Sequence, residues 1–398
     1  MAVRVSKPAF NLRDKLSELD KPTGLKGTEL MRSETSQEAR DRINSGRKNI
    51  IINGDFQIAQ RATTNNTTGA QSTYHTLDRW MTQIQAGTIT ESQQSLSSSD
   101  TGPWQKGFRR YMRILNQSGI GAGNAQYAEI DQRVEAQDIA TSGWDYTSSS
   151  SYITLSFWIR ASVAQNYIVN MYANDGTNRH FPFEVDLRAN TWTKVTKSIP
   201  GNSGITFDNN NGQGSAICFI SSYGTNYTSN SGTFNTWNTT GNGLNRWPDM
   251  DTKWSTSTNA TFDITGVQLE VGSIATEFEH RSYGEELALC QRYYQQIVST
   301  SDLVCVGPGR CNGTTNVPFS VPLSVPLRAS PAINACNFAA FTATNQVNIS
   351  NHTPAVTKWD EHNNILTLQV SGLSGMTNAR SLSVFLNSSH TFTMTAEL

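Results

Sequence analysis

The stretch that most constrains the fold is residues 262–297, FDITGVQLEVGSIATEFEHRSYGEELALCQRYYQQI, in which the hydrophobic period changes from that of a strand to that of a helix. Apolar residues alternate at Phe262 and Ile264, slip by one position across Thr265-Gly266, and resume at Val267. A change of face across a glycine predicts a strand with a bulge, because one extra residue re-aims every later side chain. This strand closes one β domain.

A connecting helix is predicted directly after that strand. Ser282 and Glu285 have the spacing of a capping box, in which both side chains satisfy free backbone N–H groups at a helix start. One apolar stripe follows at three- and four-residue spacing, formed by Leu287, Cys290, Tyr293 or Tyr294, and Ile297. We therefore expect a helix over residues 282–297 that separates a larger β domain from a smaller one.

The first 48 residues differ in composition from the rest, being rich in charge and nearly free of aromatic side chains. Two short helical patterns are expected here, one ended by Pro22 and Gly24 and one by Gly46. Helices this short need a partner surface. The segment is thus either a flexible leader or an anchor that docks on another protein, and the residues expected at that contact are Leu12, Leu16, Leu19 and Ile43.

Residues 49–281 are expected to form an antiparallel sandwich or jelly roll. The first strand is predicted within NIIINGDFQIAQR, and the clearest one spans residues 151–160, where apolar and mostly polar residues alternate. Residues 181–187 repeat that alternation, and residues 217–220 form a short apolar strand. Many short strands punctuated by Gly and Asn, with no helical period between them, are typical of such folds.

A long polar segment, residues 223–258, stands out because it holds six aromatic residues among Ser, Thr, Asn and Gly. Loops of this length inside a compact domain are usually functional or disordered, and the aromatic content argues against disorder. The aromatic residues expected to bind a ligand, including two from a similar setting upstream, are Trp144, Tyr146, Tyr223, Tyr227, Trp237, Trp247 and Trp254. Each ring could equally be part of the core.

Residues 298–398 are predicted to form a smaller C-terminal β-sandwich. Apolar residues alternate strictly from Val317 to Leu327, with Pro318, Pro322 and Pro326 at the opposite parity. Proline cannot donate to a central ladder, so this strand is expected at an edge or in irregular pairing. The predicted fold class is thus mainly β, with a short helical N-terminal anchor and a connecting helix.

Bulk composition excludes several classes of function. Net charge is −1 and charged residues make up 16% of the chain, so there is no basic footprint for nucleic acid or an anionic membrane. No stretch has the length of a membrane span or the pattern of a signal peptide. The five scattered cysteines indicate synthesis in a reducing cytosol, and buried free thiols are favoured over a disulfide between Cys305 and Cys311.

No catalytic motif is present in the sequence. It lacks the nucleophile elbow of α/β-hydrolases, the zinc-protease helix and the phosphate-binding loop. Glycoside cleavage would need paired carboxylates at a suitable separation, and no local pattern marks such a pair. A non-enzymatic protein is therefore expected, with no catalytic residues.

Three segments carry a resemblance to a known family. NIIINGDFQIAQR at 49–61, LDRW at 77–80 and ITGVQLEVGSIATEFEHRSYGEELALCQRYY at 264–294 resemble the jelly-roll domains of bacteriophage tail fibres and other adsorption proteins. The leader sequence KPTGLKGTELMRSETSQEARDRI is similar to virion-attachment segments of such fibres. These domains look like carbohydrate-binding modules, in which the first and last strands are neighbours. The resemblance implies a homotrimer, and pairing of residues 49–56 beside residues 262–271.

Relatives that bind carbohydrate often hold a structural Ca²⁺ near those strands. Asp55 and Asp263 fall at matching places in this sequence. Two carboxylates do not complete a site of six to eight oxygen ligands, so Asp side chains in solvated or turn-stabilising roles are the favoured interpretation and no metal is expected.

The leading hypothesis is a phage tail fibre protein, made in the host cytoplasm and located in the virion tail. Residues 1–48 would dock on phage tail proteins, and the β domains would bind a host-surface polysaccharide. One alternative is a purely structural neck, tail-adaptor or decoration fibre, in which the aromatic rings pack between subunits. Another is a polysaccharide depolymerase with a carboxylate pair in an open groove.

Overall fold

The chain folds into a large β-sandwich followed by a smaller β unit, as the computed structural model shows for residues 48–228, 232–239, 247–341, 346–360, 364–373 and 380–398. The mainly β fold with few helices is confirmed. The predicted anchor residues Leu12, Leu16, Leu19 and Ile43 lie outside the described residues. None of the helices within the described ranges has the length and apolarity needed to cross a membrane.

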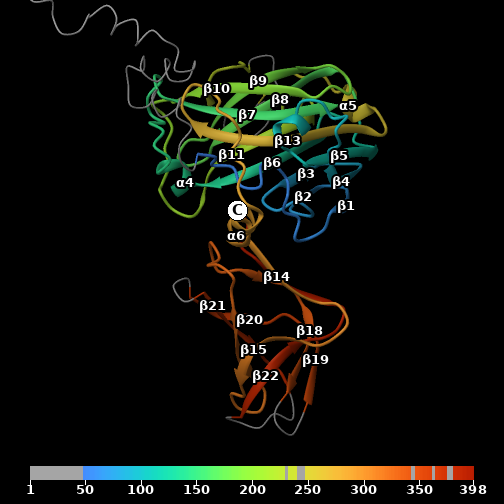
Figure 1. Cartoon of the computed structure of the whole chain (residues 1–398), viewed down its shortest axis with the longest axis vertical. Coiled ribbons are helices and arrows are strands. Elements are labelled where there is room, and N and C mark those ends of the chain that lie inside the picture. The colour runs from blue at the N-terminus through green and yellow to red at the C-terminus, as the bar shows by residue number, and fades with distance from the viewer. Residues whose placement is uncertain (1–47, 229–231, 240–246, 342–345, 361–363, 374–379) are drawn as a thin grey trace, which may run out of the picture.

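The sandwich is built from two antiparallel sheets (Figure 1). The six-stranded sheet has the order β1 (Thr64–Thr68), β4 (Thr88–Ser95), β5 (Arg110–Ser118), β13 (Ala260–Val271), β7 (Tyr152–Ala161) and β10 (Thr193–Pro200). The seven-stranded sheet has the order β12 (Asn238–Thr239), β9 (Arg179–Leu187), β8 (Gln165–Ala173), β11 (Gln213–Tyr223), β6 (Tyr127–Glu135), β3 (Met81–Ile84) and β2 (Gln71–Thr73). Three short helical segments decorate the sandwich, namely η1 (Trp104–Lys106), α4 (Ala136–Ala140) and α5 (Lys253–Thr256).

The main core fills the space between these sheets. On β7, Ile153, Leu155, Phe157 and Ile159 are fully buried, as the predicted alternation requires. Phe157 meets Phe219 of the opposite sheet edge to face, with ring centroids 5.0 Å apart. Apolar side chains of both inner faces therefore meet in one continuous cluster, which is what holds a sandwich together.

The predicted bulge in the closing strand is confirmed. Pairing of β13 with β7 shifts register between Thr265 and Gln268, and Gly266 has a φ of +61°. A Cβ at this position would lie 2.5 Å from the ring of Phe108, so both the backbone conformation and the space require glycine. After the bulge, Val267 and Leu269 return to the core.

The first segment lies beside β13 as the resemblance implied, yet it is not a strand. The Ile50 amide donates to the Leu269 carbonyl and the Val267 amide to the Gly54 carbonyl, each at 2.9 Å. Residues 51–55 form bends and a turn instead, because Asn53 has a φ of +56° and its side chain bonds to the backbone of Ile58. The predicted strand over NIIINGDFQIAQR is therefore corrected to an irregular segment held by backbone and side-chain hydrogen bonds.

The connecting helix is shorter than predicted. Helix α6 spans Tyr283–Gln291, and the Ser282 side chain accepts from the Glu285 amide as the capping pattern indicated. Residues 294–297, expected to be helical, belong to β14 (Tyr294–Ser299), because this segment pairs with β23 (His390–Thr395). Cys290 and Tyr293 are buried against Ile52, which attaches the helix to the first segment.

The C-terminal unit contains two further sheets. In the three-stranded sheet β23 lies between β14 and β17 (Ala332–Ile333). The seven-stranded sheet has the order β19 (Gln346–His352), β18 (Cys336–Phe341), β22 (Ser381–Leu386), β15 (Val304–Arg310), β16 (Val317–Pro322), β21 (Ile365–Val370) and β20 (Ala355–Asp360). Apolar side chains from both sheets, among them Phe319, Phe338 and Phe392, form its core.

The proline-rich strand ends early and pairs irregularly. β16 stops at Pro322, although the alternation continues to Leu327. It lies inside the sheet, where it forms a six-residue ladder with β21 but only the single pair Gly309↔Phe319 with β15. β15 approaches very closely, because a Cβ on Gly307 would lie 1.7 Å from the Ser320 carbonyl oxygen. Of the two predicted outcomes, irregular pairing is the correct one.

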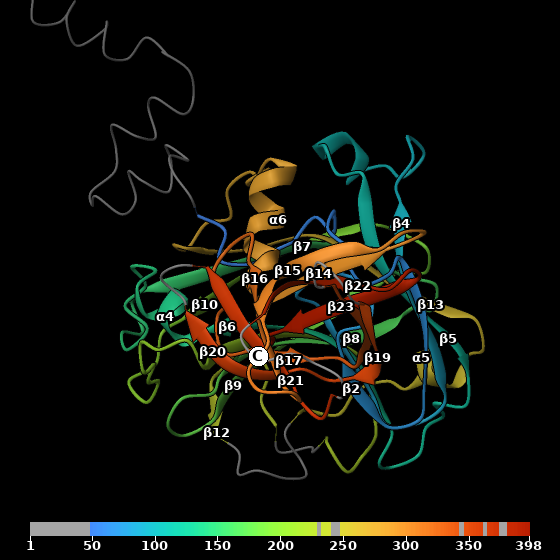
Figure 2. The same cartoon turned by 90° about the horizontal axis from the view of Figure 1, so that it is seen from below.

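Buried ion pairs join the two units at the place where α6 and the C terminus lie between them (Figures 1 and 2). Glu397 accepts from Arg61 at 2.9 Å and also from Arg79, whose side chain is 1% exposed. Glu135 accepts two hydrogen bonds from Arg292, each of 2.8 Å. Charges taken out of water are costly unless they are paired, so these contacts fix one arrangement of the junction.

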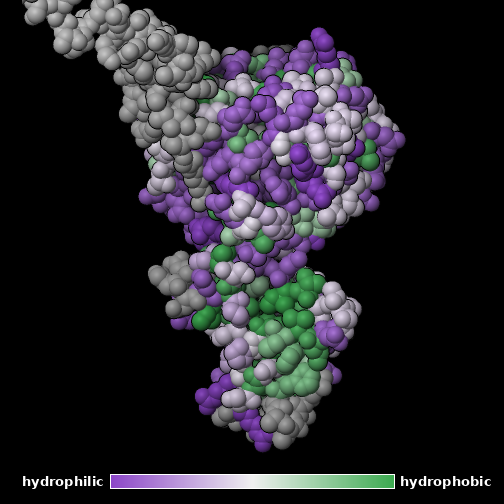
Figure 3. All heavy atoms as spheres, in the orientation of Figure 1, coloured by the Kyte–Doolittle hydropathy of each residue, from purple (hydrophilic) through white to green (hydrophobic). Residues whose placement is uncertain are grey.

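Apolar surface is distributed unevenly between the units. The jelly-roll face seen in Figure 3 is mostly hydrophilic, whereas hydrophobic residues gather on the same face of the C-terminal unit. In that unit Val298 and Leu303 are exposed to 46% and 43%.

The bulge gives a direct test of the closing strand. Gly266→Ala should lower the free energy of unfolding by about 1–3 kcal/mol, because alanine is strained at this φ and meets the Phe108 ring. Denaturant unfolding followed by tryptophan fluorescence measures the change. The control is Gly284→Ala in α6, where an added Cβ meets no atom within 4 Å and stability should stay the same or rise slightly. Equal stability of both variants would contradict the assignment.

Candidate functional site

The candidate site lies on the outer face of the seven-stranded jelly-roll sheet. Alternate residues of β6, β8 and β11 point into the core, among them Ile130, Val169 and Ile217. Their neighbours in sequence point the other way, because successive side chains of a strand face opposite sides of the sheet. The outer face therefore carries a set of polar and aromatic side chains that the core does not use.

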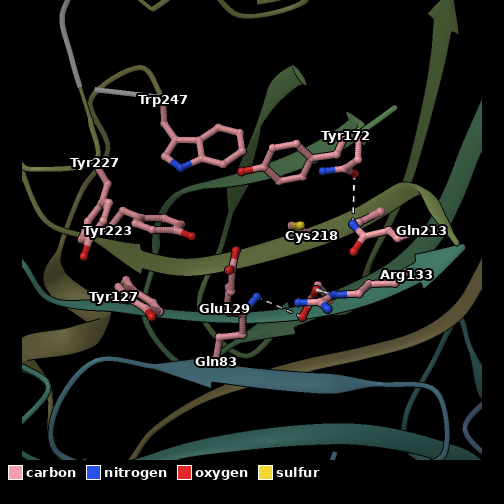
Figure 4. A pocket seen from close by; sticks show the side chains of 13 residues that line it. Gln83, Tyr127, Glu129, Arg133, Tyr172, Gln213, Cys218, Tyr223, Tyr227 and Trp247 are labelled. Atoms are coloured by element: carbon pink, nitrogen blue, oxygen red, sulfur yellow. Dashed lines mark hydrogen bonds and ion pairs between the residues drawn. The ribbon is translucent and has the colours of Figure 1, made fainter. Parts of the chain in front are cut away.

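A hollow of about 330 Å³ opens on this face (Figure 4). Strands β3, β6, β8 and β11 form its floor, and residues after β11 form one wall. It is lined by Gln83, Tyr127, Glu129, Asp131, Arg133, Tyr172, Asn174, Gln213, Ala216, Cys218, Tyr223, Tyr227 and Trp247. Its volume is within the range of small-molecule sites in proteins.

Five aromatic rings gather at one side of the hollow. Tyr127 stacks on Tyr223 with centroids 5.6 Å apart and meets Tyr227 edge to face at 5.3 Å. Trp247 packs against Tyr172 at 5.5 Å and Tyr223 at 5.9 Å. Trp247 is 0% exposed and Tyr223 only 7%, whereas the other three tyrosines are half-buried. Tyr127, Tyr172 and Tyr227 are thus the rings that a ligand can reach.

Backbone hydrogen bonds hold the wall in place. The Tyr227 amide donates to the Gly224 carbonyl at 2.9 Å, and the Trp247 amide donates to the Tyr227 carbonyl at 3.0 Å. Gly224 in turn donates to the carbonyl of Gln126, just before β6. Tyr227 and Trp247 are therefore positioned by the main chain next to the sheet, although they are distant from β6 in sequence.

Two carboxylates lie on the floor. Glu129 and Asp131 follow each other on the outer face of β6 and are 6% and 2% exposed. Asp131 Oδ1 accepts from Gln83 Nε2 at 3.4 Å, and its Oδ2 lies 3.6 Å from Arg133 Nε. Burial raises the pKa of Asp131 to about 6, although Arg133 and Gln83 oppose this shift. Burial, reinforced by the Glu129 charge, raises the pKa of the Tyr223 hydroxyl well above its ordinary value.

One hydrogen-bond donor of the wall is buried and unused. Trp247 Nε1 has no hydrogen-bond partner within the described residues. In Figure 4 the nitrogen edge of this indole faces the side of the hollow where Tyr223 lies. Buried donors are normally satisfied, so this N–H is an exception among the described residues of the wall.

Of the seven aromatic residues selected from the sequence, the structure brings three to the hollow: Tyr223, Tyr227 and Trp247. Trp144 and Trp254 are 3% and 0% exposed and belong to the core between the sheets. Tyr146 packs on Phe207, and the Trp237 indole donates to the Pro200 carbonyl at 2.6 Å. All four rings pack in or against the core of the sandwich, and none of them lines the hollow.

Sequence reasoning missed the residues that strands contribute to the hollow. Tyr127, Glu129, Asp131 and Arg133 share one parity in β6, opposite to that of the core residues. Tyr172 likewise has the parity opposite to Val169 and Met171 in β8. The alternation itself carries this signal, because residues of the parity opposite to the core must lie on the outer face of the sheet.

The two weak metal candidates have other partners. Asp263 accepts hydrogen bonds from Arg113 at 2.7 and 2.8 Å and from Arg160 at 2.9 Å. Asp55 accepts a hydrogen bond from the Gln57 side-chain amide and is 5% exposed, and burial raises the pKa of its carboxyl. Over the described ranges, His, Cys, Asp and Glu side chains form no group of three or more placed to hold a metal ion. The paired guanidinium groups give Asp263 a structural role.

Comparisons with known proteins find likeness at the level of structure. No protein-family model matches the chain, and no curated protein is similar to it in sequence. A solved carbohydrate-binding module described as CBM4 is 11% identical, with 55% of this chain and 98% of that chain covered and a TM-score of 0.27. A family 16 carbohydrate-binding module is 13% identical over 40% and 75% of the two chains, with a TM-score of 0.20.

An enzyme is also among the similar structures. A cyclase from Fischerella sp. is 13% identical, with 57% of this chain and 98% of that chain covered and a TM-score of 0.31. The similar structures thus include both carbohydrate-binding modules and a cyclase.

The buried carboxylate predicts a measurable pH effect. Between about pH 4 and 6 native Asp131 keeps a proton that the unfolded chain releases, so this residue's contribution to stability falls as the pH rises through that range. The variant Asp131→Asn lacks this pH-dependent contribution, because its amide does not titrate. Urea unfolding of both proteins from pH 4 to 8 should show wild-type stability falling relative to the variant through about pH 6, and the difference levelling off above about pH 7. Other buried carboxyls, such as Asp78, affect both proteins alike. A constant difference across the range would contradict the raised pKa.

Proposed function

We propose that the hollow on the outer jelly-roll sheet binds a glycan. The observation that carries this proposal is the half-exposed set of Tyr127, Tyr172 and Tyr227 around a floor of hydrogen-bonding side chains. A sugar ring presents a patch of C–H groups that packs on a flat aromatic face, while its hydroxyls need directional partners. Tyrosine supplies both kinds of contact at low cost in conformational entropy.

We further propose that the chain is a bacteriophage tail fibre protein, located in the virion and made in the host cytoplasm. The resemblance of residues 49–61 and 264–294 to adsorption proteins supports this role. Residues 1–48 would dock on phage tail proteins, and the hollow would contact the polysaccharide of the host surface.

Repeated copies would make a weak site sufficient. Fibres of the resembled family are trimers, and we propose that three copies of this chain associate, with the exposed Val298 and Leu303 at the contact. Several sites on one particle raise the effective concentration, so overall binding exceeds the affinity of one site by orders of magnitude. In a purely structural fibre the same tyrosines would instead be covered by another subunit.

One observation favours cleavage as a second function. Glu129 and Asp131 share the floor of the hollow, and positions two apart on a strand are separated by about 7 Å. Inverting glycosidases separate their acid and base carboxyls by a similar length, and their acid has a raised pKa, as Asp131 does. Binding remains the primary proposal. A single carboxyl with a raised pKa next to Arg133 does not by itself make a catalytic pair.

The binding proposal is tested by removing the accessible rings. Tyr127→Ala combined with Tyr172→Ala should weaken glycan-array or whole-cell binding about tenfold or more, which corresponds to about 1.4 kcal/mol. Tyr283→Ala is the matched control, because Tyr283 is 59% exposed on α6 and does not line the hollow. If the double variant bound as strongly as the control, the hollow would not be the binding site.

Cleavage is tested separately on the polysaccharide that binds. We expect no release of reducing ends during prolonged incubation with the wild-type protein. Release that is lost in Asp131→Asn while binding persists would establish hydrolysis in place of simple binding.

A further inference from the structure

We propose that the hollow selects uncharged, hydroxyl-rich glycans and excludes acidic ones, with Glu129 and Asp131 as the residues that determine this specificity. This inference rests on the proposed function and names the class of ligand that the same site takes. The residues concerned are among the least exposed on the floor.

The charges that line the hollow do not suit an acidic sugar. Glu129 and Asp131 contribute two carboxylates, and Arg133 contributes the one guanidinium among the lining residues. Arg133 is already engaged, since its Nε lies 3.6 Å from Asp131 and its Nη1 donates to the Leu398 carbonyl at 2.7 Å. Two carboxylates thus share the lining with a single guanidinium that already contacts one of them, so the lining carries a net negative charge when both acids are ionised.

The negative charge lies where a stacked sugar would be held. Glu129 is on the part of β6 next to Tyr127, and its carboxylate is close enough to Tyr223 to raise the pKa of that hydroxyl. Figure 4 shows Glu129 between the tyrosines of the wall and Arg133. An acidic sugar on these rings would bring a second carboxylate next to Glu129, and like charges brought together in a partly dry site are strongly unfavourable.

The same groups match the hydroxyls of a neutral sugar. A carboxylate accepts hydrogen bonds only, and bonds from hydroxyl donors to an ionised oxygen are stronger than those between neutral groups. The Trp247 Nε1–H, which has no hydrogen-bond partner among the described residues, places a donor at the wall. A neutral sugar, whose hydroxyls both donate and accept, can therefore satisfy the floor and the wall together.

The experiment compares one polysaccharide in two charge states. The probe is the polymer bound most strongly on an array of neutral and acidic bacterial polysaccharides, together with the same polymer after oxidation of its primary hydroxyls to carboxylates. At pH 7.5 the full-length protein should bind the oxidised form at least about tenfold more weakly. The double variant Glu129→Gln, Asp131→Asn should reduce that discrimination to less than about threefold.

A matched control comes from the same sheet. Glu184 and Asp186 are exposed on β9 and do not line the hollow, so Glu184→Gln with Asp186→Asn should keep the full discrimination. Thermal unfolding shows whether each variant is folded. Equal binding of both polymer forms by the wild type, or an acidic polymer as the strongest ligand, would overturn the inference alone. Failure of the wild type to bind any polysaccharide would overturn the proposed function, and this inference with it.

Discussion

The period of two along strand β6 is the constraint on which the site depends. Ala128, Ile130 and Val134 face the core, so Glu129 and Asp131 between them must face outward. A slip of one residue would place both carboxylates in the core and the apolar residues in water. The packing energy of the sandwich therefore also fixes the direction in which the acidic floor of the hollow points.

Contacts at the junction between the two units also hold the end of the hollow where Arg133 lies. Arg281 donates to the carbonyls of Asn49 and Ile51 and pairs with Glu286, which ties α6 to the first segment. On the other side, Arg133 reaches Leu398 from the floor itself. Because these partners are largely buried, loss of one would leave a costly unpaired charge, so the C-terminal unit is held in a defined position at one end of the site.

The sequence predicted the scaffold better than the site, for a physical reason. Burial imposes a pattern on many residues at once. The alternation in residues 151–160 and the change of face at Gly266 therefore predicted the strand and the bulge correctly. The first segment was not, since Asn53 adopts a left-handed conformation that its bonds to Ile58 stabilise. Trp254 was selected because its neighbours are polar, yet a ring in a polar loop can still fold back into the core.

Trp247 is a buried ring that helps to fix the tyrosines of the hollow in position. With no exposed area it cannot stack on a sugar, but it contacts Tyr172 from β8 and Tyr223 from the end of β11 at the same time. Rings held on several sides lose little freedom when a ligand arrives, so less of the contact energy is spent on ordering them. The same packing turns the indole N–H toward the hollow, so one residue supports the accessible tyrosines and also places a donor at the wall.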